Sequence, residues 1–229
     1  MSSIDIFVVV EGSTEQLFIK DVLAPYLVIK DIYVYPTLIG KPGHKGGDIR
    51  YDRAKEDIFR FLKQRKDTYI STMFDFFRID ADWPGMNDIR NKKKSGIKLT
   101  SEEKAAILEE ATHKMILKEI PKTNAKNRFI PYFEMHEFEA LLFSDTNVIA
   151  EKTGIAKTEL EKIIKQYKHP EDINEDPKNA PSKQLLKLKS DYKKVNTGKV
   201  IAEAIGINKI RKKCPHFDQW LKKLENLKS

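Results

Sequence analysis

Ile4-Asp-Ile-Phe-Val-Val-Val-Glu-Gly-Ser-Thr-Glu15 is the stretch that decides the fold. Residues 4–10 are mostly apolar and β-branched, which is typical of a strand buried on both faces of a parallel sheet. Glu11 and Gly12 end this run, and a helical pattern begins directly after them. Because ligands bind at the carboxyl ends of strands in open α/β sheets, we expect Glu11 to face a binding site. The alternative is a Glu-Gly turn that only ends a strand.

The composition is that of a folded protein with a very polar surface, since 40% of the 229 residues are hydrophobic and 33% are charged. The single cysteine, Cys214, excludes an internal disulfide and fits a reducing cytosol. No apolar segment approaches the roughly 18 residues of a membrane span. The N-terminus also lacks the basic start and long apolar core of a signal peptide. We therefore expect a cytoplasmic protein with no membrane partner.

The net charge of +8 is unevenly distributed along the chain. Residues 152–229 hold 19 basic and 10 acidic side chains, whereas residues 1–151 hold 23 and 24. A neutral front half and a basic back half suit a metal site beside a track for a polyanion. The alternative is a lysine-rich surface that is merely solvated.

Alternating strand and helix patterns predict an α/β fold. Strands are predicted at 4–10, 32–39, 68–74 and 129–135, and helices at 14–27, 51–64, 100–120 and from 136 onward. The polar residues 87–96 are expected to form a surface loop. The later helices are predicted at about 147–153, 157–167, 181–189, 198–205 and 215–227. We expect a sheet domain at 1–145 and a basic helical subdomain at 146–229 packed on it.

A glycine-rich loop, Gly40-Lys-Pro-Gly-His-Lys-Gly-Gly47, follows the second predicted strand. Its glycines would let backbone N–H groups approach an anion, and its basic side chains add positive charge. The spacing fits neither a P-loop nor a dinucleotide-binding motif. A flexible connector is the alternative to a phosphate-contacting loop. The candidates for contacting a phosphate are Lys41, His44, Lys45, Gly46 and Gly47.

Two of the predicted strands end in a carboxylate, Glu11 and Asp75. In a parallel sheet both would reach the same edge, where they repel each other unless a cation or a proton joins them. Mg²⁺ is commonly bound by one or two carboxylates and waters. Asp80 and Asp82 follow in the next loop, and either could complete the cluster.

A further group of acids lies around His136. Glu137 and Glu139 would point about 200° apart on one helix, so they share a ligand only if the helix begins between them. His136 itself is expected to be an ordinary histidine, because hard divalent ions prefer oxygen ligands.

Seven motifs jointly resemble the bacterial domain-of-unknown-function family 4276. They are Val10-Glu-Gly-Ser-Thr-Glu15, the loop Gly40–Gly47, Met73-Phe-Asp75 with Ala81-Asp-Trp-Pro-Gly85, His136-Glu-Phe-Glu-Ala-Leu-Leu-Phe-Ser-Asp145, Pro170-Glu-Asp-Ile-Asn174, Ala180-Pro-Ser-Lys183 and Cys214-Pro-His-Phe-Asp218. The strand-end acids also resemble the Toprim fold of topoisomerases, primases and the overcoming-lysogenisation-defect nucleases. The family is regarded as Toprim-like, and its genes often neighbour ATPases of the ABC or structural-maintenance type in phage-defence loci.

The resemblance to Toprim enzymes implies a role for each matching acid. Glu11 would act as acid/base or metal ligand, and Asp75 would hold Mg²⁺. The usual Asp-x-Asp does not follow, because position 77 is Phe77; Asp80-Ala-Asp82 has that spacing five residues later. Asp82 lies in the family's own motif and is preferred to Asp80. Glu137 or Glu139 would supply a further carboxylate.

We therefore expect a nuclease dependent on Mg²⁺ or Mn²⁺ that cleaves nucleic acid, DNA more than RNA. Two metals about 4 Å apart would stabilise the attacking and leaving oxygens. Lys45 would steady the scissile phosphate, and the basic C-terminal helices would grip the backbone. The resemblance adds a role in anti-phage defence with an ATPase partner, and a homo-oligomer is compatible with it.

Two alternatives remain open. The first is a catalytically inactive Toprim subunit that binds nucleic acid or an ATPase partner, as the missing Asp-x-Asp suggests. The second is a phosphoryl-transfer or hydrolytic enzyme that uses the same acids on a small nucleotide.

Overall fold

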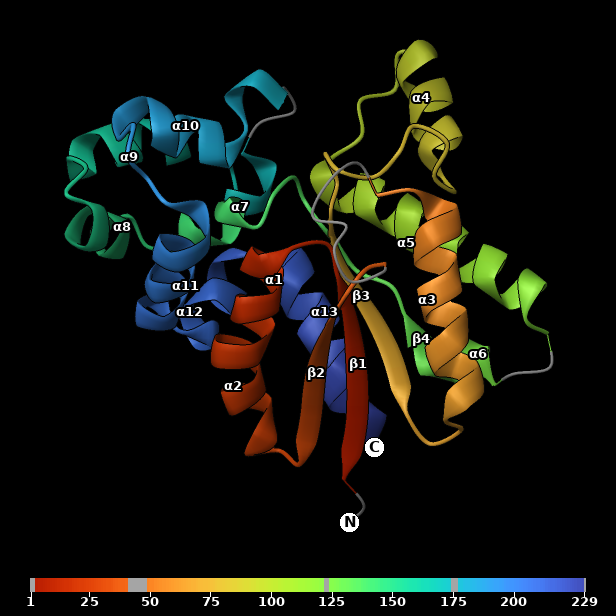
Figure 1. The fold of residues 1–229 in the computed structure, drawn as a ribbon. Coiled ribbons are helices and arrows are strands. Elements are labelled where there is room, and N and C mark those ends of the chain that lie inside the picture. Colours follow the sequence, from red (N-terminus) through yellow and green to blue (C-terminus); the bar gives the residue numbers. More distant parts are fainter. Residues whose placement is uncertain (1–2, 41–48, 122–123, 174–176, 229) are drawn as a thin grey trace.

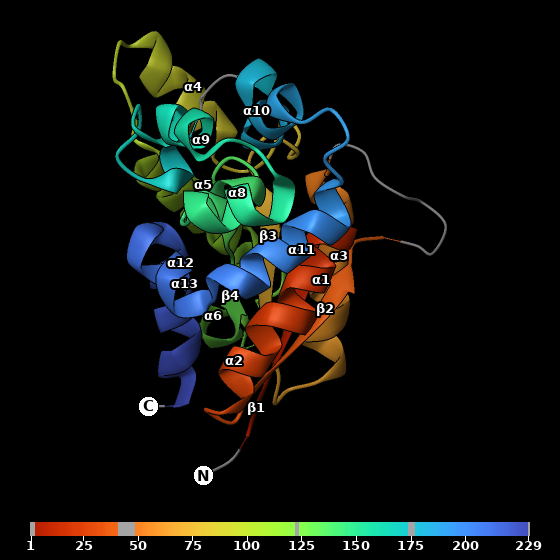
Figure 2. The same ribbon diagram turned by 90° about the vertical axis from the view of Figure 1, so that its left-hand side faces the viewer.

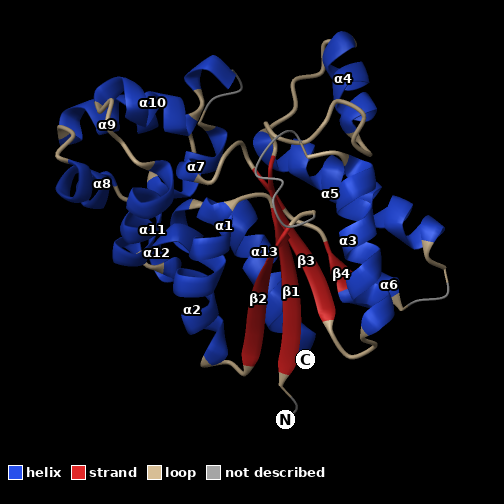
Figure 3. Cartoon of the chain, in the orientation of Figure 1, coloured by secondary structure: helices blue, strands red, loops and turns tan. Residues whose placement is uncertain are grey.

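The computed structural model describes residues 3–40, 49–121, 124–173 and 177–228 (Figure 1). Within them, one parallel sheet contains β1 (Ile4–Val10), β2 (Ile32–Leu38), β3 (Tyr69–Asp75), β4 (Phe129–Ile130) and β5 (Phe133–Glu134). The strand order is β2-β1-β3-β4, and β5 pairs with β3 beyond β4 (Figure 3). The predicted α/β fold with a mainly parallel sheet flanked by helices is confirmed.

Helices cover both faces of this sheet (Figures 1 and 2). One face packs against α1 (Ser13–Phe18), α2 (Ala24–Val28), α11 (Lys194–Ile205) and α13 (Pro215–Glu225). The other packs against α3 (Tyr51–Gln64), α5 (Ser101–Glu119) and α6 (Ala125–Arg128). The remaining helices are α4 (Met86–Lys94), α7 (Glu139–Leu142), α8 (Thr146–Thr153), α9 (Lys157–Ile164), α10 (Pro181–Leu188) and α12 (Ile207–Lys213).

Strand β1 is buried on both of its faces, as its sequence predicts. Ile6 and Val8 point into the core on the α1 side, and Val9 points into the core on the α3 side; all three are fully buried. A strand between two helical layers has no solvent face, so its sequence is apolar without strict alternation.

The helices after residue 145 belong to the same core as the sheet. In α13, the Trp220 ring stacks on Tyr132 with a centroid distance of 4.3 Å, and its Nε1–H donates to Ser71 Oγ at 2.9 Å. Helix α11 packs directly on α1, so the first and last thirds of the chain lie side by side (Figure 2). The basic C-terminal stretch thus completes one face of the sheet.

Two predicted elements are interrupted, each next to a proline. The strand expected at 129–135 divides into β4 and β5, because Pro131 has no N–H to donate to the ladder. Thr72 replaces the missing ladder bonds: its Oγ1 accepts from Tyr132 N–H at 2.9 Å and donates to Tyr132 O at 3.0 Å. The helix expected at 14–27 contains a π-helical segment, Ile19–Leu23, just before Pro25.

The prediction of a surface loop at 87–96 is wrong, because helix α4 forms most of this segment. Gly85, with a φ of 93°, makes the left-handed turn into the helix, and Ile89 is its buried residue. A helix with a single buried side chain shows no apolar periodicity, so the pattern does not predict it. None of the helices in the described ranges has the length and apolar character needed to cross a membrane.

Arg128 ties the end of α6 to the end of α3. Its buried guanidinium donates to three backbone carbonyls: Leu62 O at 2.9 Å, Arg65 O at 2.6 Å and Thr68 O at 3.1 Å. A cation at a helix C-terminus also interacts favourably with the helix dipole.

Replacing Arg128 with Met should therefore lower the free energy of unfolding by about 2–4 kcal/mol, because buried carbonyls lose a charged donor. Urea denaturation measures this. Lys63→Met, at an exposed position on α3, is the control and should change stability by less than about 0.5 kcal/mol. Equal effects of the two substitutions would show that Arg128 is not a structural anchor.

Candidate metal centre

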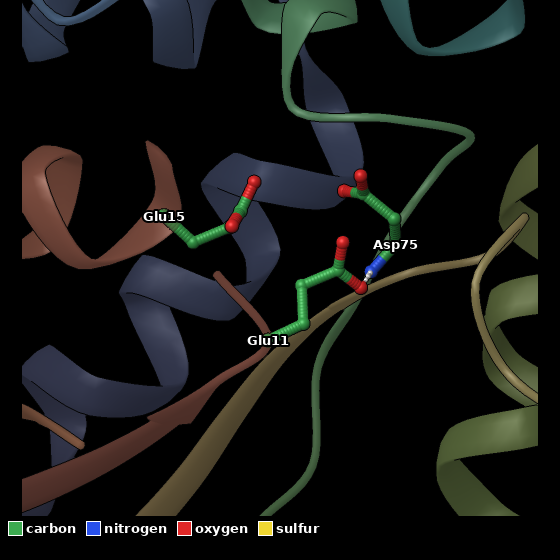
Figure 4. A group of neighbouring side chains, drawn as sticks. All are labelled: Glu11, Glu15 and Asp75. Carbon is green, nitrogen blue, oxygen red and sulfur yellow. Dashed lines mark hydrogen bonds between the residues drawn. The ribbon is translucent and has the colours of Figure 1, made fainter. Parts of the chain in front are cut away.

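Three carboxylates meet at the carboxyl edge of the sheet (Figure 4). Glu11 follows β1, Glu15 lies in the first turn of α1, and Asp75 is the last residue of β3. Each offers a carboxylate oxygen, and these atoms all lie within 4.8 Å of one another. The parallel register of β1 and β3, which pairs Val10 with Met73, places Glu11 beside Asp75.

Gly12 lets Glu15 reach this edge. Gly12 is extended and forms the N-cap of α1, so the chain turns abruptly from strand to helix. A Cβ atom at position 12 would lie 3.1 Å from Glu15 Oε2, which is a close contact. A larger residue would push the Glu15 carboxylate aside. Glu15 is 2% exposed, although glutamates in the first turn of a helix are usually solvated.

The hydrogen bonds of the cluster hold two of the carboxylates but leave one oxygen unsatisfied. Glu11 Oε2 accepts from Asp75 N–H, and Glu11 Oε1 accepts from Arg78 Nε–H, both at 3.3 Å. Asp75 Oδ1 accepts from Phe138 N–H at 3.0 Å. Asp75 Oδ2 is fully buried and has no hydrogen-bond partner among the residues that the structure describes. A buried oxygen without a donor is unfavourable unless a proton or a cation satisfies it.

Burial raises the pKa values of all three acids, and repulsion by neighbouring carboxylates adds to this rise for Glu11 and Asp75. Burial raises the pKa of Glu11 to about 7, with a further rise from Glu15, while Arg78 opposes both. Burial followed by the charges of Glu11 and Glu15 raises the pKa of Asp75 well above its usual range. The pKa of Glu15 is raised mainly by burial. Without a cation, this site therefore retains protons at a pH where exposed carboxylates have lost them.

A fourth acid and a lysine lie next to the cluster. Glu139, the first residue of α7, is fully buried, and its Oε2 lies 2.8 Å from Lys194 Nζ at the start of α11. Burial raises the pKa of Glu139 to about 7, against the opposing charge of Lys194. Burial would lower the pKa of Lys194, but Glu139, Asp75 and Glu137 outweigh it and raise that pKa. The C-terminal half thus delivers an ammonium group to an acidic site of the N-terminal half.

The other predicted acids have different surroundings. Helix α7 does begin between Glu137 and Glu139, but Glu137 Oε2 accepts from Ser182 N–H at 3.1 Å and caps α10. Asp82 is exposed, and the three-carboxylate group found among the described residues does not include it. The reason is Trp83, whose buried ring donates to Thr112 Oγ1 at 2.9 Å and turns the preceding residue outward.

Asp80 and His136 are not members of the three-carboxylate group found among the described residues. The Asp80 N–H donates to Ile49 O at 2.9 Å, so this residue belongs to the bridge between segments 49 and 79. The His136 ring stacks on Phe77 with a centroid distance of 4.9 Å. The glycine-loop candidates Lys41, His44, Lys45, Gly46 and Gly47 lie outside the described residues. The preceding Ile39 N–H donates to Val10 O at 2.9 Å, so residue 39 lies beside the end of β1.

The sequence prediction missed Glu15 and Lys194 as members of this site. For Glu15 there was a signal, because a glutamate four residues after Glu11 and three after a glycine cap can turn back toward the strand end. For Lys194 there was none, since its partner Glu139 is distant in sequence and the surrounding stretch is uniformly rich in lysine.

In EDTA at pH 8, Asp75→Asn should raise the melting temperature, because it removes the cost of keeping either a proton or a negative charge on this buried carboxyl group at that pH, and it keeps an Oδ1 for Phe138 N–H. Each kcal/mol corresponds to about 2–4 °C in a chain of this size. Asp145→Asn is the matched control: Asp145 pairs with Lys209 and caps α8, so its substitution should lower the melting temperature. A loss of stability in both variants would contradict the repulsive cluster.

The match to known proteins covers nearly the whole chain. A family model described as "Domain of unknown function (DUF4276)" matches residues 10–225, which include every residue of the carboxylate cluster. No curated protein and no solved structure matches. The chain therefore belongs to the DUF4276 family.

Proposed function

We propose that Glu11, Glu15 and Asp75 bind a divalent cation, Mg²⁺ or Mn²⁺, and that the protein uses it to hydrolyse phosphodiester bonds in nucleic acid. The observation that carries this proposal is the fully buried, unpartnered Asp75 Oδ2 within a group of three carboxylates. An all-oxygen donor set suits a hard ion such as Mg²⁺. A cation there would offset the cost of burying three carboxylates and the repulsion that adds to the raised pKa values of Glu11 and Asp75.

Two positively charged side chains near the carboxylates, Arg78 and Lys194, support a substrate that contains phosphate. Arg78 uses only its Nε–H on Glu11, and about half of its side chain is exposed. Its remaining N–H groups can therefore form the paired hydrogen bonds that guanidinium makes with phosphate oxygens. Lys194, which pairs with Glu139 and lowers the pKa values of Glu11 and Asp75, adds a second positive charge. Positive groups around a metal ligand set stabilise the charge that develops on a phosphoryl group.

Each side chain then has a distinct task. A bound divalent ion would polarise the phosphate and lower the pKa of an attacking water. Glu11, held by Asp75 N–H and Arg78, is positioned to bind the ion or to take a proton from water. Lys194 would keep Glu139 ionised and close to the site. The Toprim resemblance favours this assignment of Glu11 and Asp75, while Glu15 replaces Asp82 as the third ligand.

A catalytically inactive, nucleic-acid-binding or ATPase-binding subunit is the second candidate. The observation that favours it is that the two remaining candidate ligands already have partners within the chain, since Glu137 caps α10 and Glu139 pairs with Lys194. The described residues thus offer one group of three ligands, whereas two-metal nucleases need more. The ATPase partner and the role in anti-phage defence remain predictions from the family resemblance.

Cleavage of labelled DNA and RNA oligonucleotides in Mg²⁺ or Mn²⁺ tests the proposal. Glu15→Gln and Asp75→Asn should each lower the rate by at least about 100-fold, because they remove charge that acts on the transition state. Asp82→Asn should stay within about threefold, since a residue outside the site has little effect on its electrostatics. Free nucleotides in parallel identify a small-molecule hydrolase. A fully active Glu15→Gln variant would overturn the ligand set, and intact oligonucleotides despite bound metal would favour the inactive subunit.

The affinity for Mg²⁺ should rise with pH between about 6 and 8. The pKa of Glu11 is raised to about 7, so below that pH the ion must displace a proton, and above it the ligand is already ionised. The expected loss is up to about tenfold per pH unit for each displaced proton. Isothermal titration calorimetry at several pH values measures it, with Asp75→Asn as the variant that should lose binding. A pH-independent affinity would show that these carboxylates are not the ligands.

A further inference from the structure

A basic hollow lies outside the carboxylate cluster, in the C-terminal half of the chain. It is a cavity of about 540 Å³ between the start of α8, the segment after α9, and α12. Figure 2 shows these three elements on the side facing the viewer. The residues that give it its chemical character are Asp145, Lys168, His169, Lys209, Lys212 and Lys213. We call this cavity the basic hollow.

The positive charge of the basic hollow is largely uncompensated. Asp145 is the single acidic residue in the described part of its lining, and that carboxylate already pairs with Lys209 and caps α8 through Asn147 N–H. Lys168, Lys212 and Lys213 are exposed and have no ion pair or hydrogen bond within the described ranges. Three free ammonium groups around one opening attract anions and repel other cations.

The basic hollow is firmly connected to the carboxylate cluster. Helix α7 begins with Glu139, which lies next to the cluster, and the residues that follow the helix, Phe143 and Ser144, line the basic hollow. Ser144 Oγ lies 3.3 Å from the buried Cys214 Sγ, so the end of this segment is fixed to the residue after Lys213. Because the chain spans at most about 3.6 Å per residue, residues 139 and 146 lie at most about 25 Å apart.

We propose that the basic hollow binds backbone phosphates of a nucleic-acid strand whose other phosphates lie at Glu11, Glu15 and Asp75. The identity of the ligand rests on the proposed function. Lysine is a point-charge binder of phosphate and does not need a fixed hydrogen-bond geometry, which suits contacts independent of base sequence. The lining contains one Phe, Tyr or Trp residue, Phe143, which is 3% exposed, so none of these large rings is available for a base to stack on.

A strand explains the surroundings better than a small anion. Residues 152–229 carry nine more basic than acidic side chains, a surplus that a single phosphate group would not require. Neutralising a row of phosphates releases condensed counterions, so the affinity gained per lysine is large at low salt. A distance of at most about 25 Å corresponds to about seven nucleotides at 3.4 Å each, so a short strand reaches both places.

The test compares two double variants with the same change in charge. Lys212→Glu/Lys213→Glu alters the basic hollow, and Lys63→Glu/Lys66→Glu alters exposed lysines at the end of α3 and before β3, at the opposite edge of the sheet. Fluorescence anisotropy measures the binding of labelled single-stranded and duplex oligonucleotides across a range of salt concentrations. The buffer contains EDTA, so cleavage and metal binding cannot contribute.

The hollow variant should bind on the order of tenfold more weakly at low salt, and its slope of log affinity against log salt should fall by about 1.4–1.8. The control variant should stay within about twofold of the unmodified chain, because the lost charges lie far from the strand. Equal weakening of both variants, or of neither, would overturn the proposal. So would displacement of the oligonucleotide by millimolar inorganic phosphate or a mononucleotide at constant ionic strength, because it would identify a small-anion site.

The same experiment separates this inference from the proposed function. Asp75→Asn should bind oligonucleotides with the hollow-dependent affinity of the unmodified chain, yet fail to cleave them when Mg²⁺ is added. If binding depends on the basic hollow but no form of the protein cleaves the oligonucleotides, the basic hollow is a nucleic-acid site and the nuclease proposal is refuted. If metal-dependent cleavage and binding do not depend on Lys212 and Lys213, the nuclease proposal stands and the proposal that the basic hollow binds the strand is refuted.

Discussion

Mutual repulsion of buried carboxylates is the constraint on which the site depends. The parallel pairing of β1 with β3 delivers Glu11 and Asp75 to one edge, and the turn at Gly12 adds Glu15. The sheet core fixes these positions, so the charges cannot move apart to relieve the repulsion. They are compensated by whatever donors and cations the surrounding segments supply. Protons fill this role in the free chain, and the raised pKa values are the result.

The compensation comes from parts of the chain that are remote in sequence. Arg78 follows β3, the Phe138 N–H precedes α7, and Lys194 begins α11. The last of these is in place only because α11 packs on α1 and α13 completes the sheet face. The C-terminal helices therefore have two roles, since they bury the sheet and also adjust the electrostatics of its edge. Substitutions deep in that packing should alter the site without touching it.

The sequence predicts those features that depend on local patterns. The strands, the helical cover and the strand-end acids Glu11 and Asp75 follow from apolar runs and the turns that end them, and all are present. Glu15 was missed because its helix pattern is ordinary, and only the backbone turn at Gly12 directs it inward. Asp82 has the expected spacing, but the anchoring of Trp83 turns it to solvent. At Pro131 the hydroxyl group of Thr72 on the neighbouring strand replaces the missing ladder bonds. The sequence pattern of 129–135 does not predict this contact.

The contact between Ser144 and Cys214 gives the chain a built-in reporter. Burial raises the pKa of the Cys214 thiol well above its usual range, so the reactive thiolate is scarce and shielded while the helices remain closed. Alkylation of the single cysteine then depends on how often the junction of α12 and α13 opens. Its rate would measure the local breathing of the segment that links the basic helices to the acidic edge, with no engineered label.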